Sequence, residues 1–183
     1  KGQAMTVEFI PSGSITSVPG FRAAGVACGL KKNDALDLAL VAADQPCVAA
    51  AVFTTNRVKA APVLYDQQAL AQHPSSLRGV VINSGCANAC TGVRGLEDAR
   101  NTAAALAQAL GGVPEEWMVM STGVIGQHLP MDKILTGIER AEAVLSHEES
   151  AGHDAARAIM TTDTQPKEAA VRVAWESGQC VIA

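Results

Sequence analysis

Apolar residues recur at helical spacing in three stretches of the second half of the chain. Between positions 96 and 110 they lie three or four residues apart, which predicts an amphipathic helix ending at the Gly111-Gly112 pair. A second stripe, over 131–138, follows Pro130, a residue well tolerated in the first turn of a helix. A third stripe, made of small residues, runs over 149–159. The pattern therefore predicts three helices.

Short apolar runs elsewhere predict strands. The segments "GVVIN" at 79–83 and "WMVMS" at 117–121 each read as one buried strand. The Gly-rich region around 13–32 predicts loops with short strands. Strands that alternate with helices are typical of a sheet covered by helices, so we expect a mixed α/β fold.

Two further pairs of apolar runs predict hairpins. The runs 35–43 and 47–55 flank Asp44 and Pro46, which are common turn residues, so we expect a turn between two strands there. The C-terminal segment "EAAVRVAWESGQCVIA" predicts a second hairpin with its turn at 176–179.

Composition supports one domain, residues 1–183, with large buried faces. Of the 183 residues 48% are apolar and only 17% are charged, which excludes a disordered chain and is consistent with a subunit interface. Aromatic residues make up 3%, so the core has to be built from Ala, Val, Leu and Ile.

Charge and hydropathy argue against several classes of function. The net charge of -4 and the scattered basic residues do not favour nucleic-acid binding. No apolar run reaches the length of about 18 residues that a membrane span needs. The first residues lack the apolar stretch of a signal peptide, so we expect a cytoplasmic protein without membrane contact. The five cysteines have no framework spacing, which predicts reduced, mostly buried thiols.

Glycines follow the predicted strand at 117–121. Thr122 and Gly123 come directly after it, and Gly126 follows. Glycine lets backbone N–H groups converge on one point, where they can hold an anion or an oxyanion. A tight turn needs the same small residues, and the local pattern leaves both interpretations open.

The loop "NSGCANACTG", 83–92, is rich in groups that form hydrogen bonds. The side chains of Asn83, Ser84, Asn88 and Thr91 are expected to bond mainly to their own backbone. Cys86 and Cys90 are a poor zinc pair because no second pair of ligands accompanies them, so we expect no metal.

No complete catalytic motif is present. The four histidines pair with no carboxylate at a telling spacing, and the sequence contains no G-x-S-x-G elbow, P-loop or Rossmann glycine pattern. If the chain belongs to an enzyme, it therefore contributes residues around the nucleophile but not the nucleophile itself.

A polar segment, "MTTDTQPK", follows the third predicted helix. Thr161, Thr162 and Asp163 can cap backbone groups or form an Asx-turn ahead of Pro166. Alternatively, one of the threonines faces a pocket and binds a polar substrate. Local chemistry does not decide between these two interpretations.

Several long stretches of the sequence decide between these two interpretations, because together they resemble a known family. These are "GFRAAGVACGLK" at 20–31, "NRVKAAPVL" at 56–64, "NSGCANACTG" at 83–92, "STGVIGQHLPMDKI" at 121–134 and "AIMTTDTQPK" at 158–167. In this order they resemble the α subunit of the bifunctional glutamate N-acetyltransferase (ornithine acetyltransferase) family, almost from end to end.

The resemblance implies a layered sheet-and-helix sandwich of the self-processing, N-terminal-nucleophile-like type. The family precursor cleaves itself at an Ala-Thr bond into α and β chains that assemble as α2β2. The N-terminal Thr of β is the nucleophile and its own amine serves as base. It takes acetyl from N-acetylornithine and passes it to glutamate in arginine biosynthesis. Acetyl-CoA is a second candidate donor, and no cofactor is implied.

The resemblance also assigns residues. Thr122 and Gly123 match the oxyanion-hole positions of the family, and Thr161 matches a substrate-binding threonine. In the family the α chain continues past the position of Ala183 and holds a further substrate-binding Lys. That Lys and the nucleophilic Thr of the β chain are not part of this sequence.

Three alternatives stand beside this interpretation. One is a self-processed N-terminal-nucleophile amidase or aminopeptidase of the same fold, which would need no acceptor amino acid. Another is an anion- or nucleotide-binding module built on the Gly123–Gly126 loop. The last is a non-catalytic structural partner.

Overall fold

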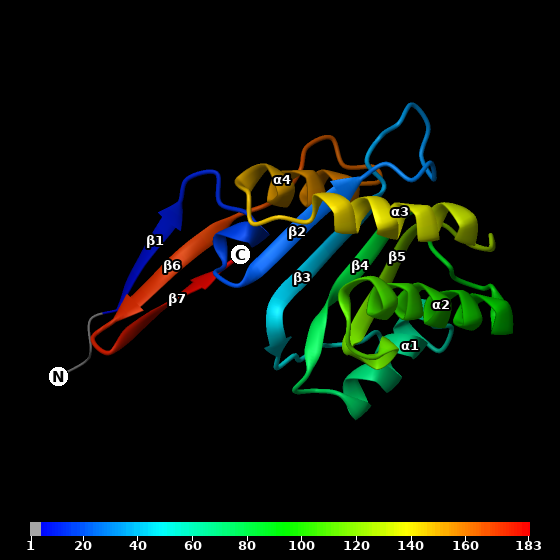
Figure 1. The fold of residues 1–183 in the computed structure, drawn as a ribbon, viewed down its shortest axis with the longest axis horizontal. Helices are drawn as coiled ribbons and strands as arrows, with labels where there is room; N and C mark the ends of the chain where they lie inside the picture. The colour runs from blue at the N-terminus through cyan, green and yellow to red at the C-terminus, as the bar shows by residue number, and fades with distance from the viewer. Residues whose placement is uncertain (1–4) are drawn as a thin grey trace.

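The computed structural model describes residues 5–183, which form helices and two sheets (Figure 1). In chain order the elements are β1 (Thr6–Ile10), a 3₁₀ turn η1 (Ile15–Ser17), β2 (Phe21–Val26), β3 (Leu38–Cys47), α1 (Ala61–Gln72), β4 (Leu77–Cys86), α2 (Gly92–Leu110), a 3₁₀ turn η2 (Pro114–Glu116), β5 (Trp117–Val124), α3 (Met131–Val144), α4 (Glu149–Ala158), β6 (Ala170–Trp175) and β7 (Gly178–Ile182). The layered α/β fold expected from the sequence is confirmed.

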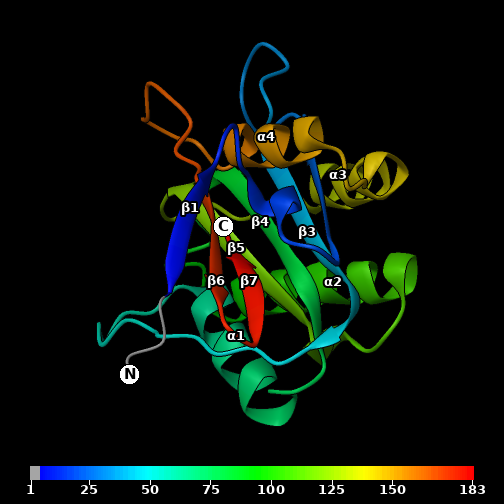
Figure 2. The same ribbon diagram turned by 90° about the vertical axis from the view of Figure 1, so that its left-hand side faces the viewer.

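The central sheet has four strands in the order β2-β3-β4-β5. Strand β3 is antiparallel to both of its neighbours, β2 and β4, whereas β4 and β5 are parallel. A second sheet, β1-β6-β7, lies at one end of the molecule, opposite to α2 (Figure 1). Seen from that end, α2 and α3 lie on the same side of the central sheet (Figure 2).

One face of the central sheet is closed by helices. Residues that lie opposite one another in the ladder, such as Leu40 and Val81, point to the same side of a sheet. These two and Val119 are at most 2% exposed and belong to one apolar core with α1, α2 and α3. Trp117 fills this core and donates from Nε1 to the Gly111 carbonyl at 3.0 Å, so its polar atom is satisfied.

The other face is covered only in part. Over β2 and β3 the small residues Ala23 and Ala39 pack against Ala155 and Ala158 of α4. Helix α4 approaches so closely that a side chain at Gly25 would collide with the Asp154 carbonyl. Over β4 and β5 the same face stays open, and Met120 is 45% exposed there.

Most of the predicted elements are confirmed. The helices expected from the three apolar stripes are α2, α3 and α4, the two buried strands are β4 and β5, and the C-terminal hairpin is β6-β7. The turn of that hairpin is shorter than expected, because Trp175 already pairs with Gly178. Among residues 5–183 no helix is long and apolar enough to cross a membrane.

The predicted hairpin over 35–55 is wrong. Asp44 and Pro46 lie inside one continuous strand, β3, and a register shift between Ala42 and Cys47 accommodates them. The Asp44 amide donates to the Gly20 carbonyl at 2.8 Å and its carboxylate pairs with Arg22. Residues 48–60 form no strand.

Helix α1 was not predicted, because its buried face contains Tyr65 and Asp66 rather than an apolar stripe. The expectation of mostly buried thiols is also wrong in part. Cys28 and Cys86 are buried, Cys47 is half-buried, and the remaining two cysteines are exposed.

Candidate active site

The carboxyl ends of β4 and β5 lie side by side and carry the predicted oxyanion residues. Ser84 is opposite Thr122, and Gly85 is opposite Gly123 in the parallel ladder. Both glycines have positive φ angles, +117° and +128°. A Cβ atom on Gly123 would lie 2.6 Å from the Gly85 carbonyl oxygen, so only glycine fits at this position.

The loops that follow the two strands are joined to each other. The Ala87 amide donates to the Val124 carbonyl at 2.9 Å, and the Gly126 amide donates to the Ala89 carbonyl at 2.9 Å. Because the Gly126 N–H is used in this way, it does not point freely toward a bound anion. This arrangement weakens the anion-module alternative and fixes the backbone around Gly123.

Thr122 and Gly123 remain accessible. Thr122 is half-buried and Gly123 is exposed. The Thr122 hydroxyl forms no hydrogen bond with any other residue of the range 5–183. A hydroxyl donor next to a glycine with positive φ, at the open end of a parallel strand pair, can stabilise developing negative charge on an oxygen.

Most polar groups of the 83–92 loop serve the loop itself, as predicted. Asn83 donates to the Cys86 carbonyl at 2.8 Å and accepts from the Ser121 hydroxyl at 2.6 Å. Thr91 donates to Asn88, which in turn donates to the Gly95 carbonyl, both at 2.8 Å. Three of the four singled-out side chains thus bond to residues close to them in the sequence.

Ser84 is the exception. It is fully buried, and its hydroxyl donates to the Ala158 carbonyl at 2.5 Å, across 74 residues of sequence. Ala158 is the last residue of α4 and lies three positions before Thr161. The contact therefore ties the strand that flanks Thr122 to the helix that leads into Thr161.

The predicted substrate residue Thr161 lies in the exposed segment after α4. Its hydroxyl bonds to no other residue within 5–183, Thr122 and Gly123 included. Asp163 pairs with Lys167, and this ammonium group lowers the pKa of the Asp163 carboxyl. The end of α4 is closed by backbone bonds such as Ile159 to Ala155, so a capping role for Thr161 is not seen.

A buried carboxylate shapes the neighbouring loop. Asp37, at 0% exposure, accepts from the amides of Cys28 and Leu30 at 2.6 Å and from that of Lys31 at 2.9 Å. Burial, followed by the nearby Asp37 carboxylate, raises the pKa of the Cys28 thiol to about 12. The Asp37 carbonyl accepts the Ser84 amide at 2.8 Å. Asp37 therefore holds both the 28–31 loop and the end of β4.

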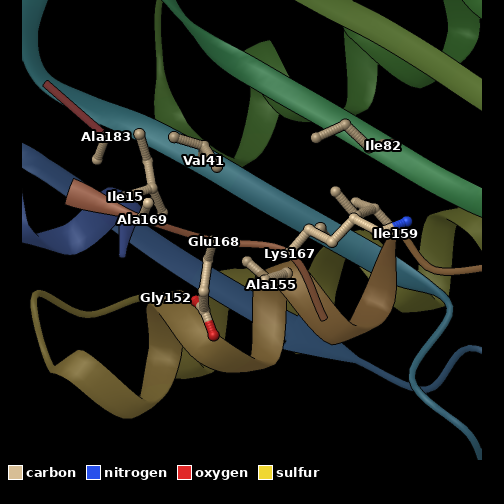
Figure 3. Close-up of a pocket in the computed structure, with 12 residues that line it drawn as sticks. Ile15, Val41, Ile82, Gly152, Ala155, Ile159, Lys167, Glu168, Ala169 and Ala183 are labelled. Atoms are coloured by element: carbon tan, nitrogen blue, oxygen red, sulfur yellow. The ribbon is translucent and has the colours of Figure 1, made fainter. Parts of the chain in front are cut away.

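A cavity of about 200 Å³ opens on the partly covered face of the sheet, between the central strands and α4. Val41 and Ile82 project into it from β3 and β4, Ala155 projects from α4, and Ile159 projects from the position directly after that helix (Figure 3). Its lining is mainly apolar, and the segment before β6 contributes Lys167, Glu168 and Ala169 to its rim.

The sequence analysis found no histidine at a telling spacing from a carboxylate, and for His153 this is wrong, because Glu149 lies one helical turn before it. His153 lies between Glu149, at 3.2 Å, and Glu168, at 2.8 Å, and His147 lies 3.4 Å from Asp44. The two glutamates, Glu168 first, raise the pKa of His153. Within residues 5–183 no group of three His, Cys, Asp or Glu side chains is placed to hold a metal ion.

Sequence reasoning missed Lys31 and Asp37 and gave Ser84 only a local role. One signal was available for Asp37, because a carboxylate inside the apolar run "ALDLALVAA" has to find partners when it is buried. No spacing signal could have joined Lys31 to the end of α4, since 127 residues separate them.

Comparisons with known proteins agree with this architecture. The ArgJ family matches residues 22–183. An arginine biosynthesis bifunctional protein ArgJ of Dehalococcoides mccartyi is 43% identical over 97% of this chain and 43% of its own length. A protein of the same name from Symbiobacterium thermophilum is 51% identical over 88% of this chain and 40% of its own length. The chain thus spans about two fifths of the curated relatives it matches.

Two solved structures share the fold. A chain of the Bacillus halodurans bifunctional protein ArgJ superposes with a TM-score of 0.92 at 36% identity, covering 98% of this chain and 92% of that one. A chain of the Mycobacterium tuberculosis ornithine acetyltransferase, crystallised with ornithine, gives 0.88 at 44% identity, covering 97% and 92%. By fold and by sequence, the chain belongs to the ArgJ family.

Proposed function

We propose that this chain is the α part of an ornithine acetyltransferase that moves acetyl from N-acetylornithine to glutamate. The observation that supports this most directly is the pairing of Thr122 and Gly123 with Ser84 and Gly85, which presents a free hydroxyl and a glycine backbone at one open edge. The names of the relatives and the ornithine complex of one of them point to the same substrates.

In the proposed reaction the nucleophile comes from the β chain. Its N-terminal Thr hydroxyl attacks the acetyl carbonyl and passes its proton to its own amine. The Thr122 hydroxyl and the Gly123 N–H stabilise the resulting oxyanion. The C–N bond then breaks, ornithine leaves with the proton, and an acetyl-threonine remains. Attack by the glutamate amine reverses these steps and restores the threonine.

Thr161 has a separate role in this proposal. It is exposed on the segment that α4 leads into, and its hydroxyl is available to a ligand. We assign it to binding of the acetylornithine or glutamate substrate. Acetyl-CoA is a second acetyl donor in the proposal, because the relatives are called bifunctional, and the chemistry needs no cofactor.

The proposed partner is a β chain of the same precursor, which completes the unit formed by residues 1–183. The open face over β4 and β5 supports this, since Met120 is 45% exposed there and the nearby cavity is mainly apolar. We propose an α2β2 assembly in the cytoplasm.

Two substitutions in the complete enzyme test the proposal. Thr122→Val removes one oxyanion donor and is expected to lower kcat by about 10²- to 10³-fold without unfolding the protein. Thr161→Val is expected to raise the KM for N-acetylornithine. Thr136→Val, at an exposed position of α3, is the matched control and should change neither constant.

The assay follows ornithine release with and without glutamate. Release that depends on glutamate supports acetyl transfer, whereas sustained release without any acceptor would indicate the amidase alternative. An unchanged kcat in Thr122→Val would remove this residue from the oxyanion hole.

A further inference from the structure

We propose that Lys31 is a positioning residue that holds the end of α4, and with it Thr161, at a fixed place relative to Thr122 and Gly123. The inference rests on the proposed function for the meaning of Thr161, but its structural part can be tested separately. Lys31 is far in the sequence from all three site residues, and only the folded chain brings it to the helix that leads into Thr161.

The backbone of Lys31 is fixed by a buried acid. Asp37 receives the amides of Leu30 and Lys31 on one carboxylate oxygen, at 2.6 and 2.9 Å. Bonds between an ionised acceptor and backbone donors are stronger than neutral ones, so this loop is held firmly. The Leu30 side chain lies against Gly85, since a Cβ on that glycine would be 3.2 Å from the Leu30 Cβ.

The side chain of Lys31 then reaches the end of α4. Its ammonium donates to the Leu36 carbonyl at 2.8 Å and to the Ala158 carbonyl at 3.3 Å. The last carbonyls of a helix lack partners within the helix, and a cation there is favourable. Burial lowers the pKa of Lys31, while the Asp37 charge opposes that shift.

The Ala158 carbonyl is shared by two donors from different parts of the chain. Ser84 reaches it from β4 and Lys31 reaches it from the loop after β2. Since Ser84 also donates its amide to the Asp37 carbonyl, the contacts form a closed ring through Asp37, Lys31, Ala158 and Ser84. We call these four residues the α4 anchor.

The α4 anchor limits the distance between the two parts of the site. Ser84 lies directly opposite Thr122 in the ladder. Thr161 follows Ala158 by three residues, which span at most about 10 Å. Any movement of the end of α4 therefore moves Thr161 relative to the oxyanion residues.

Loss of the Lys31 ammonium affects the end of α4 but not the strands that carry Thr122 and Gly123. Thr122 and Gly123 stay in place because the β4–β5 ladder and the Asp37–Ser84 bond do not involve the lysine side chain. The Ala158 carbonyl loses one of its two donors, so the last turn of α4 is held less firmly. We therefore expect weaker substrate binding with little change in the chemical step.

The experiment compares Lys31→Met, Lys31→Arg and Lys32→Met in the complete, self-processed enzyme. Lys32 is the matched control because it is exposed and adjacent. Lys31→Met should raise the KM for N-acetylornithine about 10-fold and leave kcat within about 2-fold. Lys31→Arg should recover most of the wild-type KM, since a guanidinium can donate to two carbonyls.

Hydrogen exchange of residues 156–160, the last turn of α4 and the two residues after it, gives a readout that does not need turnover. In the absence of substrate, exchange in this segment should be faster in Lys31→Met than in the wild type and unchanged in Lys32→Met. Exchange at wild-type rates in Lys31→Met overturns the positioning role. So does a variant that loses kcat and thermal stability while its KM is unchanged.

The two proposals fail in different ways. A wild-type enzyme that transfers no acetyl group to glutamate refutes the proposed function, whatever the exchange rates are. Normal acetyl transfer together with unchanged hydrogen exchange of residues 156–160 in Lys31→Met refutes only the role of Lys31.

Discussion

Replacing Asp66 with asparagine should stabilise the protein, and the gain should grow with pH. Asp66 lies on α1 at 3% exposure, and its Oδ1 accepts the Val119 amide at 2.9 Å. Burial raises the pKa of this carboxyl from 3.8 to about 7, although the Val119 N–H partly opposes the shift. An asparagine oxygen can keep the bond to Val119 without a buried charge.

The magnitude follows from the difference in pKa. The folded protein keeps the proton up to about pH 7, whereas the unfolded chain releases it near pH 3.8. Wild-type stability therefore falls as the pH rises between these values and is constant above them. At about 1.4 kcal/mol per pKa unit, the cost is about 2 kcal/mol at pH 5 and about 4 kcal/mol at pH 8.

The assay is the thermal unfolding midpoint of the complete enzyme at pH 5 and pH 8, for wild type and Asp66→Asn. Glu139→Gln, at an exposed position of α3, serves as the control for loss of one negative charge. The advantage of Asp66→Asn should be larger at pH 8, while the control shows no such trend. A variant that is destabilised at pH 8, or whose advantage is the same at both pH values, would refute the reasoning.

Three other changes have defined outcomes. Gly123→Ala should lower kcat at least about 10-fold in steady-state assays, because its Cβ collides with the Gly85 backbone; a wild-type kcat would contradict the close approach. His153→Gln should lower the unfolding midpoint at pH 6 but not at pH 9, since a raised pKa stabilises the folded state below the ordinary value and this is lost as the histidine deprotonates. Gly25→Ala should cost about 1–3 kcal/mol of stability by displacing α4, measured by the same midpoint; a neutral effect would mean that α4 is less tightly packed than described.

Periodicity predicted the elements that bury one clear apolar side. Helices α2 and α3 bury residues such as Leu106 and Ile134 at helical spacing. The predicted end of α2 and the predicted start of α3 are close to the observed ones, whereas α2 begins four residues earlier and α3 ends six residues later than the stripes indicated. Helix α1 has no such stripe because its inward side carries Tyr65, whose hydroxyl donates to the Pro114 carbonyl at 2.6 Å, and Asp66. A hydropathy pattern does not identify polar residues that are buried because they have hydrogen-bond partners.

The wrong hairpin has a similar cause. Asp44 and Pro46 favour a turn locally. In the structure, however, the Arg22 side chain and the Gly20 carbonyl bind Asp44, so that it can remain in strand β3. Tertiary contacts thus override the turn preference. For the site, family resemblance indicated Thr122, Gly123 and Thr161, and only the fold reveals that the α4 anchor lies between them.

The anchor also has a consequence for the order of folding. Its two bonds to Ala158 close loops of 74 and 127 residues, whereas the β4–β5 ladder and the helices that cover it come from nearer segments. During synthesis the ladder that holds Thr122 and Gly123 can assemble before α4 has left the ribosome, but Thr161 cannot be fixed until residue 158 has docked. Within this chain the two halves of the candidate site are therefore assembled at different times, and the half that carries Thr161 forms after the half that carries Thr122 and Gly123.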